Sequence, residues 1–361
     1  MRRKEITQTI REEKRMSWMG KVVVSAVAGA AVLSGAVALS NAYAQEVKGP
    51  KVTWKFNVWG KKRAFTADVE AWSKYVAEKT GGNFKIKIYY GDQLGGKKQN
   101  LDNIKAGVFQ TAKVCWAYHA GKNKAMTVLN LPFLPIKNFD MQRKVSEAIH
   151  KHPIAAGEIK KKWNGMAFST SNLPQYEFLG RGKAPRKLED FKGMTVRALG
   201  GMAGAMRKLG VSIATMTATE VYQAIERGAA DAVSFPSTYA HSAYKIDEVA
   251  TWFTSNLSPG TVDCPNVINI TAWNKLPEQY KKLMHQAKEK GYAALKAAYS
   301  AKDKVNLPKW RKYMEEIKYS DAELARFRKV GGQPVYDEWV AKYKGEFDSK
   351  AMLDAVLAAA K

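Results

Sequence analysis

The sequence predicts an α/β fold, and the clearest evidence is the stretch from Lys187 to Tyr244. Short apolar runs of strand length alternate there with segments whose apolar residues repeat every 3.6 positions. In chain order these segments are 194–199, 202–209, 212–215, 219–227 and 231–235. Gly228 and Pro236 end two of them, as residues that interrupt regular structure. Arg197 lies near the carboxyl end of the first predicted strand, and open α/β sheets bind their ligands at that edge.

Length and composition indicate about two domains with a buried core. The chain has 361 residues, of which 46% are hydrophobic, and its formal net charge is +26. Positions 1–44 hold seven lysines and arginines and three acidic residues, which leaves +22 for the rest. This charge favours anionic partners. Because the lysines are spread along the chain, without an arginine-rich block or a zinc-finger pattern, we expect no nucleic acid partner.

The N-terminus has the pattern of a secretory signal peptide. Basic residues precede a small, apolar stretch at Val22–Leu39, and an Ala-x-Ala sequence at 42–44 comes before Gln45. The stretch is nearly long enough to span a bilayer, so an uncleaved anchor is the alternative. Its small residues and the Ala-x-Ala ending favour cleavage, and Met16 is a second candidate for the first residue. We therefore expect a signal peptide at 1–44 and a mature protein in the periplasm.

Two motifs resemble those of a known transporter family. Their sequences are DFKGMTVRALGG, from Asp190, and TEVYQAIERGAADAVSFP, from Thr219. Together they are similar to the substrate-binding proteins of TRAP (tripartite ATP-independent periplasmic) transporters, and the similarity extends over most of the mature chain. The resemblance implies a two-lobed periplasmic binding protein fold, type II-like, with hinge-crossing strands and a long connecting helix. The implied domains are domain I at 45–174 plus 261–300 and domain II at 175–260 plus 301–361.

The remaining elements are predicted from apolar spacing along the chain. Strands are expected at 53–59, 84–90 and 113–119, with a crossover strand between the domains at 165–179 and a return strand at 267–272. Helices are expected at 66–79, 141–162 with a break near Pro153, 320–330 and 334–345. The long helix begins at Leu276-Pro277, with proline in its first turn. The last helix, 348–360, is expected to pack on domain II.

A glycine-rich loop at 91–98 is similar to a phosphate-binding loop but lacks part of its chemistry. It follows a predicted strand and precedes a helix, as a P-loop does. However, Lys98 stands where Ser or Thr must hold Mg²⁺. The same loop and the helix after it match a usual pattern of the TRAP family. We therefore expect no nucleotide and no other cofactor.

The resemblance implies that a carboxylate ligand binds Arg197, whose planar guanidinium offers two parallel donors. Glu177 stands where sialic-acid and dicarboxylate binders have a second arginine. It either pairs with a cationic part of the ligand or with an arginine, or it points elsewhere. Phe235 stands where many relatives have an asparagine that helps to hold the carboxylate. Ser234 replaces the metal-binding glutamate of a 2-oxo-acid subgroup, so we expect no metal.

Aromatic and small residues complete the expected set of ligand contacts, which adds Trp59, Trp116, Tyr118, Gly201, Ala218 and Cys264. Ala218 leaves room where the sialic-acid branch has phenylalanine. With Phe235, the aromatic members predict a pocket that has apolar walls and one anion anchor. A single arginine favours a monocarboxylate, and the aromatic walls favour an aromatic or branched apolar acid. The sequence RALGGMAG is closer to the 2-oxo-acid subgroup, so a 2-oxo acid is also expected.

The chain has two cysteines, Cys115 and Cys264. The family alignment puts both on strands of domain I that face the ligand cleft. An exported protein meets an oxidising compartment, where disulfides persist. A Cys115–Cys264 disulfide is therefore a hypothesis, because sequence alone does not show that two cysteines are close.

These features predict a monomeric binding protein that closes on a small organic acid by a hinge. It would deliver this ligand to a TRAP membrane permease. An exported enzyme acting on a small anionic substrate is the alternative, and an adhesion or scaffold protein is a third possibility. The five histidines form no H-E-x-x-H motif and there is no G-x-S-x-G sequence, so we do not expect an enzyme.

Overall fold

The computed structural model describes residues 46–361, so the predicted signal peptide at 1–44 lies outside the described residues. The description below concerns the compact unit Val47–Lys361. Across residues 46–361, no helix is both long enough and apolar enough to cross a bilayer.

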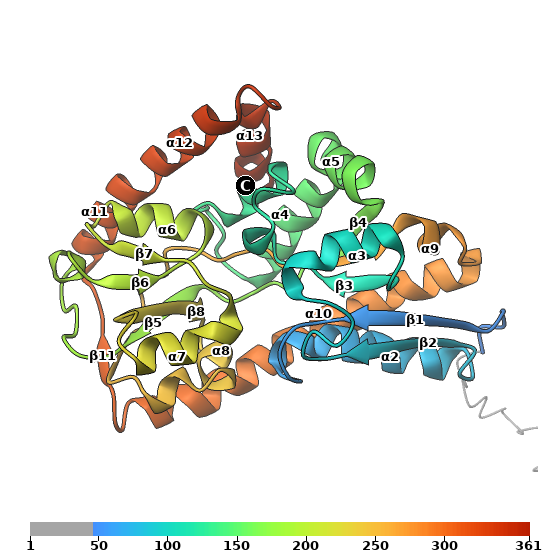
Figure 1. The fold of residues 1–361 in the computed structure, drawn as a ribbon, viewed down its shortest axis with the longest axis horizontal. Coiled ribbons are helices and arrows are strands. Elements are labelled where there is room, and N and C mark those ends of the chain that lie inside the picture. Colours follow the sequence, from blue (N-terminus) through green and yellow to red (C-terminus); the bar gives the residue numbers. More distant parts are fainter. Residues whose placement is uncertain (1–45) are drawn as a thin grey trace, which may run out of the picture. The chain divides into compact units, whose positions relative to one another are not determined.

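The first sheet has five strands in the order β2-β1-β3-β10-β4 (Figure 1). They are β1 (Val52–Asn57), β2 (Phe84–Tyr89), β3 (Thr111–Lys113), β4 (Gly165–Ser169) and β10 (Asn266–Asn269). β1 is parallel to β2 and β3, and β10 is antiparallel to β3 and β4. In β2, Phe84 and Ile86 are buried whereas Lys85 and Lys87 are exposed, which is the alternation expected of a strand with one face on the core.

The second sheet has six strands in the order β11-β9-β5-β8-β6-β7. They are β5 (Tyr176–Gly180), β6 (Thr195–Arg197), β7 (Ser212–Ala214), β8 (Ala232–Pro236), β9 (Trp252–Thr254) and β11 (Glu315–Ile317). β6 is parallel to β7 and β8, and β5 is antiparallel to β8 and β9. The two sheets confirm the predicted α/β class. We call the part built on the first sheet lobe I and the part built on the second sheet lobe II.

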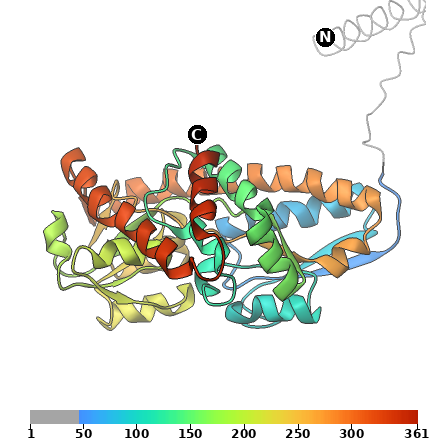
Figure 2. The ribbon, with the colours of Figure 1, turned by 90° about the horizontal axis from the view of Figure 1, so that it is seen from above.

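The helices that surround the sheets are shown in Figures 1 and 2. They are α2 (Ala67–Lys79), α3 (Asn100–Ala106), α4 (Phe139–Lys151), α5 (Pro153–Trp163), α6 (Gly200–Arg207), α7 (Val221–Glu226), α8 (Tyr239–Ala243), α9 (Ile270–Asn274), α10 (Glu278–Trp310), α11 (Asp321–Gly331), α12 (Gln333–Tyr343) and α13 (Ser349–Ala359). Side-chain caps fix several of their starts. Asn138 accepts a hydrogen bond from the Met141 amide at the start of α4, and Ser320 and Glu323 form a capping box at the start of α11.

The polypeptide crosses between the lobes along separate segments. It leaves lobe I after β4 and enters lobe II at β5, returns between β9 and β10, and crosses again through α10 towards β11. The sequence predicted one continuous strand over 165–179, but residues 170–175 interrupt it. Pro174 has no N–H to donate to a ladder, and Asn172 has a φ of 41°, which no strand residue adopts.

The long helix α10 packs on both lobes, as predicted for the connecting helix. It lies against α2 in lobe I, where a Cβ on Gly291 would come within 2.5 Å of the Trp72 indole nitrogen. Glycine at this position therefore allows the two helices to approach. Towards lobe II, the Tyr299 ring of α10 stacks on Tyr239 of α8, with centroids 4.8 Å apart. Seen from above, α10 extends along both lobes (Figure 2).

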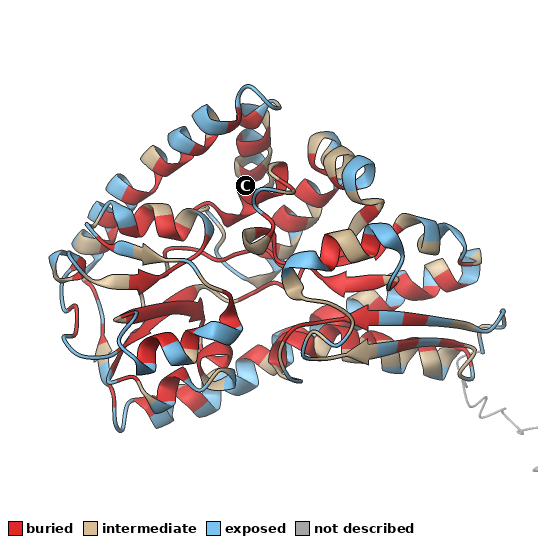
Figure 3. Cartoon of the chain, in the orientation of Figure 1, coloured by how far each residue is buried: buried red, intermediate tan, exposed pale blue. Residues whose placement is uncertain are grey.

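The last helix, α13, packs its buried face on lobe I (Figure 3), whereas the sequence predicted packing on the second domain. Its side chains Met352, Leu353 and Val356 share a buried cluster with Val145 and Ile149 of α4. The apolar face of the helix was visible in the sequence, but its partner was not. Apolar spacing shows which face is buried and does not show which surface covers that face.

Candidate functional site

A small cavity lies between the two lobes. Its lining includes side chains from both of them and from the segment that joins β4 to β5. The lining residues are Trp59, Arg63, Phe65, Cys115, Tyr118 and Cys264 from lobe I, Leu173 from the joining segment, and Tyr176, Arg197, Ala218, Phe235, Pro236, Tyr239, Ala240 and Tyr244 from lobe II. Most are buried aromatic or small apolar residues, and none is acidic. The two arginines therefore give this cavity a positive charge.

Arg197 ends β6 and is completely buried, with 0% of its surface exposed. Its Nη1 donates to the Ser234 carbonyl at 2.8 Å, and its Nε and Nη2 donate to the Met216 carbonyl at 3.2 and 3.1 Å. A guanidinium has five N–H groups, so these bonds leave donors for a ligand. Within residues 46–361, no acidic side chain pairs with Arg197. A buried cation without a counter-ion is costly, so this site favours an anion.

Aromatic rings form the walls around this guanidinium. Arg197 lies over the Phe235 ring, with Cζ 4.7 Å from the ring centroid. On the lobe I side, the Trp59 ring packs against Phe65 and Tyr118 at centroid distances of 5.2 and 5.6 Å. The Ala218 amide donates to the Tyr118 hydroxyl at 3.1 Å, a hydrogen bond that joins lobe II to lobe I beside the cavity. The geometry is that of a cleft closed around its interior.

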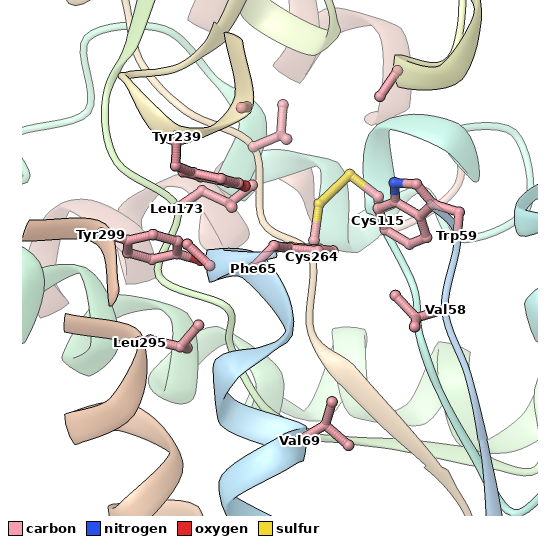
Figure 4. Packing of buried hydrophobic residues seen from close by; sticks show 14 of the residues in the cluster. Val58, Trp59, Phe65, Val69, Cys115, Leu173, Tyr239, Cys264, Leu295 and Tyr299 are labelled. Carbon is pink, nitrogen blue, oxygen red and sulfur yellow. A yellow bond between two sulfur atoms is a disulfide. The ribbon is translucent and has the colours of Figure 1, made fainter. Parts of the chain in front are cut away.

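The disulfide hypothesis is confirmed, because Cys115 and Cys264 are joined. Figure 4 shows this bond, which joins Cys115, two residues after the end of β3, to Cys264, two residues before the start of β10, so neither cysteine lies on a strand as the resemblance implied. Both cysteines line the cavity. The bond therefore fixes two distant parts of the chain, 149 residues apart, in one wall of the cavity.

Six of the nine predicted contact residues line this cavity: Trp59, Tyr118, Arg197, Ala218, Phe235 and Cys264. Trp116 does not. Its indole Nε1 donates to Asp263 at 2.9 Å inside lobe I. Gly201 lies where α6 meets the 130–132 segment, since a Cβ there would be 2.7 Å from the Asn130 carbonyl oxygen. Close packing accounts for that glycine.

Glu177 also lies outside the cavity, so the structure does not support it as a ligand contact. Its carboxylate accepts hydrogen bonds from the Thr254 hydroxyl at 2.5 Å, the Leu257 amide at 3.2 Å, and the amide and hydroxyl of Ser258 at 2.9 and 2.7 Å. Burial raises the pKa of this carboxyl group, and the four donors oppose that shift. Of the two interpretations left open by the sequence, the geometry matches the one in which the side chain points elsewhere.

Several large side chains of the lining were not predicted from the sequence. They are Arg63, Phe65, Tyr176, Tyr239 and Tyr244. Arg63 follows β1 by six residues, and ligands of parallel strands bind beyond their carboxyl ends, so its position was a usable signal. It also means that the cavity has a second arginine, contrary to the predicted single anion anchor. Tyr239 and Tyr244 lie on or next to the short helix α8, whose orientation the sequence does not show.

Ser234, which stands in the place of a metal-binding glutamate, uses its hydroxyl to donate to the Arg197 carbonyl at 3.1 Å. Within the described part of the chain, there is no group of three or more His, Cys, Asp or Glu side chains with the spacing of a metal site.

Two lobes joined by hinge segments around one charged cleft define the class of extracytoplasmic solute-binding proteins. The sequence pattern of the bacterial extracellular solute-binding proteins, family 7, matches residues 57–343, so the chain belongs to this family. The family resemblance predicted from the sequence is confirmed.

Individual relatives agree with this assignment. The chain is 27% identical to a monocarboxylate 2-oxoacid-binding periplasmic protein of Nostoc sp. over 66% of its own length and 65% of that protein. A TRAP solute-binding protein of Rhodoferax ferrireducens, solved with copurified benzoate, has a TM-score of 0.73 and 20% identity over 86% of this chain and 97% of that one. A marine metagenome TRAP protein in complex with 3-hydroxybenzoate has a TM-score of 0.70 and 20% identity over 86% and 98%. The predicted two-lobed fold is thereby confirmed.

Proposed function

We propose that this protein captures a small organic acid in the cavity between its lobes and delivers it to a TRAP membrane permease. The observation that carries the proposal is Arg197, a completely buried guanidinium that faces the cavity with no acidic side chain paired to it among the described residues. A carboxylate ligand would supply the missing negative charge and accept the remaining N–H groups.

The walls support a monocarboxylate with an aromatic ring or a 2-oxo group. Trp59 and Tyr118 offer aromatic surface to a ligand, and Phe235, whose ring contacts Arg197 and Tyr244, adds an apolar edge. Benzoate and 3-hydroxybenzoate occupy two proteins of the same fold, and the Nostoc relative is named for 2-oxo acids. We further propose that the protein acts in the periplasm as a monomer, after cleavage of the signal peptide at 1–44.

The lining also supports a binding protein over the alternative of an exported enzyme. It contains no serine, histidine or carboxylate that could act as a nucleophile or a general base. Its two cysteines are joined to each other and are therefore unavailable as thiolates.

The proposal is tested by measuring ligand affinity with and without the Arg197 guanidinium. Native mass spectrometry of the purified mature protein first identifies any copurified acid. Isothermal titration calorimetry then uses benzoate, pyruvate and phenylpyruvate as probes. We expect Arg197→Gln to weaken binding of the probe by about 2–5 kcal/mol, which is a loss of affinity of roughly thirtyfold to several thousandfold.

Arg181→Gln is the matched control. Arg181 follows β5 in the same lobe, is exposed, and donates to the Glu226 carbonyl at 3.2 Å, so its removal takes away the same charge outside the cavity. The affinity of the Arg181→Gln variant for the probe should equal that of the wild type. An Arg197→Gln variant that binds within threefold of the wild type would overturn the assignment, as would turnover of the probe.

A further inference from the structure

Two polar groups in the cavity wall, other than Arg197, have no partner. The Nε of Arg63 and the hydroxyl of Tyr244 are buried and make no hydrogen bond of normal geometry within the described residues. The Trp59 indole lies beside the Tyr244 phenol, but an indole N–H only donates, so the phenol proton still has no acceptor. Buried donors of this kind are rare in native structures unless a ligand or water takes them.

The guanidinium of Arg63 and the hydroxyl of Tyr244 converge from opposite lobes, and the guanidinium atom nearest the phenol is Nη1. A Cβ placed on Gly60 would lie 3.0 Å from Nη1 of Arg63 and 3.1 Å from the Tyr244 hydroxyl, so both polar ends gather over this glycine. The Arg63 guanidinium also lies over the Tyr244 ring, with Cζ 5.6 Å from the centroid. Arg63 belongs to lobe I and Tyr244 to lobe II. A ligand atom at this point would contact both lobes.

The position of Arg63 is fixed without a counter-ion. Its Nη1 donates to the Trp59 carbonyl at 2.8 Å and to the Lys61 carbonyl at 2.7 Å. None of the ion pairs within residues 46–361 includes it, whereas the neighbouring Lys62 pairs with Glu70. Burial raises the pKa of Tyr244, so its phenol keeps its proton at neutral pH and can donate. The pair therefore offers donors and positive charge, which suit an oxygen acceptor.

This second group of donors is separate from the Arg197 anchor. The rings of Phe235 and Tyr244 stack with centroids 5.3 Å apart, and each guanidinium covers one of them. Arg197 lies over Phe235 and Arg63 lies over Tyr244. The two cations therefore contact different rings of one stacked pair.

We propose that Arg63 and Tyr244 form a second ligand subsite, which binds an oxygen acceptor at the end of an aromatic acid remote from the carboxylate. This inference rests on the proposed function, because it takes Arg197 as the carboxylate anchor. The ligand class is thereby narrowed to aromatic acids whose ring carries a hydroxyl or carboxylate group opposite or meta to the first carboxylate. A ring that carries only hydrogen or methyl at those positions would leave both buried donors unpaired.

The test uses pairs of probes that differ only in this acceptor: 4-hydroxybenzoate against 4-methylbenzoate, and 3-hydroxybenzoate against 3-methylbenzoate. Calorimetry of the wild type should show at least a tenfold preference for the hydroxy acid in one pair, because the methylated acid leaves a buried donor unpaired. In Arg63→Gln and in Tyr244→Phe, this preference should fall to threefold or less.

Lys62→Gln is the control, because Lys62 is one residue from Arg63 and its side chain is 73% exposed. It should leave the preference intact. The subsite is refuted if the wild type shows no preference in either pair, if Arg63→Gln weakens both members of a pair equally, or if no benzoate derivative binds. If pyruvate or another acid then binds and is lost in Arg197→Gln, the proposed function stands and only the second subsite is wrong.

Discussion

Two buried side chains of lobe II, Arg197 and Glu177, differ in how completely the protein supplies their hydrogen-bond partners. They lie on β6 and β5, with β8 between these strands, and are 0% and 4% exposed. Glu177 receives four hydrogen bonds from the 254–258 segment. Arg197 donates to two backbone carbonyls, faces a cavity, and has no acidic partner within the described residues.

The difference shows how a structural charge can be distinguished from a binding charge. A charge that serves the fold is solvated completely by fixed donors of the protein, because any unpaired remainder destabilises the native state. A charge that serves a ligand is left with open donors, and the ligand completes its shell. Burial alone does not separate these two cases, since both side chains are inaccessible.

The largest effect on stability is expected for Glu177→Ala. This change leaves the Thr254, Leu257 and Ser258 donors unpaired in a buried place, so the free energy of unfolding should fall by about 3–5 kcal/mol. Urea unfolding followed by circular dichroism measures this loss. Benzoate affinity of the folded variant should stay within threefold of the wild type.

Glu177→Gln provides the graded control, because it keeps one acceptor oxygen and should be destabilised by less than the alanine variant. A strong loss of benzoate affinity in a Glu177→Gln protein of near-normal stability would contradict the division of roles between the two charges.

A smaller effect is expected from removing the disulfide in the lobe I wall. The double variant Cys115→Ser, Cys264→Ser opens a covalent loop with a sequence separation of 149 residues. Its free energy of unfolding should be about 2–4 kcal/mol lower than that of the wild type. The measurement is urea unfolding in the absence of reductant, repeated with dithiothreitol as the internal control. Dithiothreitol should destabilise the wild type and leave the double variant unchanged; equal curves for the untreated proteins would show that the bond contributes no stability.

The smallest effect concerns pH and His119, which is buried in lobe I and whose Nε2 lies 3.0 Å from the Lys97 carbonyl. Burial lowers its pKa to about 4 from an ordinary value of 6.5. Between these pH values the unfolded chain binds one proton more than the folded protein. The contribution of neutral His119 to the free energy of unfolding is therefore complete above pH 6.5 and is lost as the pH falls towards 4.

His119 contributes a slope of at most about 1.4 kcal/mol per pH unit to the dependence of the unfolding free energy on pH. His119→Gln should therefore flatten the dependence of the unfolding free energy on pH by about one proton over that range. Urea titrations at several pH values measure the slope, and an unchanged slope in the variant would assign the acid sensitivity to other groups, such as the buried His241.

Much of the fold was predictable from the sequence because it depends on local patterns. The alternation in 84–90, the strand and helix order of 187–244 and the break near Pro153 all correspond to observed elements. The partner of α13 was not predictable, since an amphipathic helix shows a buried face without showing what covers it.

The site was predictable only in part, for a similar physical reason. Arg197, Trp59 and Phe235 come at strand ends, which a topological rule connects to ligands. Glu177 was expected to contact the ligand, but its carboxylate bonds to Thr254, Leu257 and Ser258 while the neighbouring Tyr176 lines the cavity. Neighbouring residues of a strand point to opposite faces, and the sequence does not show which face meets the cavity. Arg63 and Tyr244 come together only when the two lobes meet, so no local spacing predicts that they are neighbours.

The position of β10 has a consequence for how the protein is made. This strand, Asn266–Asn269, lies between β3 and β4 in the first sheet, although most of lobe II separates it from them in the sequence. A chain that is still being synthesised therefore has β4 without its neighbour, and lobe I is incomplete until about three quarters of the residues have emerged. Such late, non-local pairing delays folding. The first sheet therefore depends on one of the last strands to be made, and a truncation before β10 would leave lobe I without the strand that joins β3 to β4.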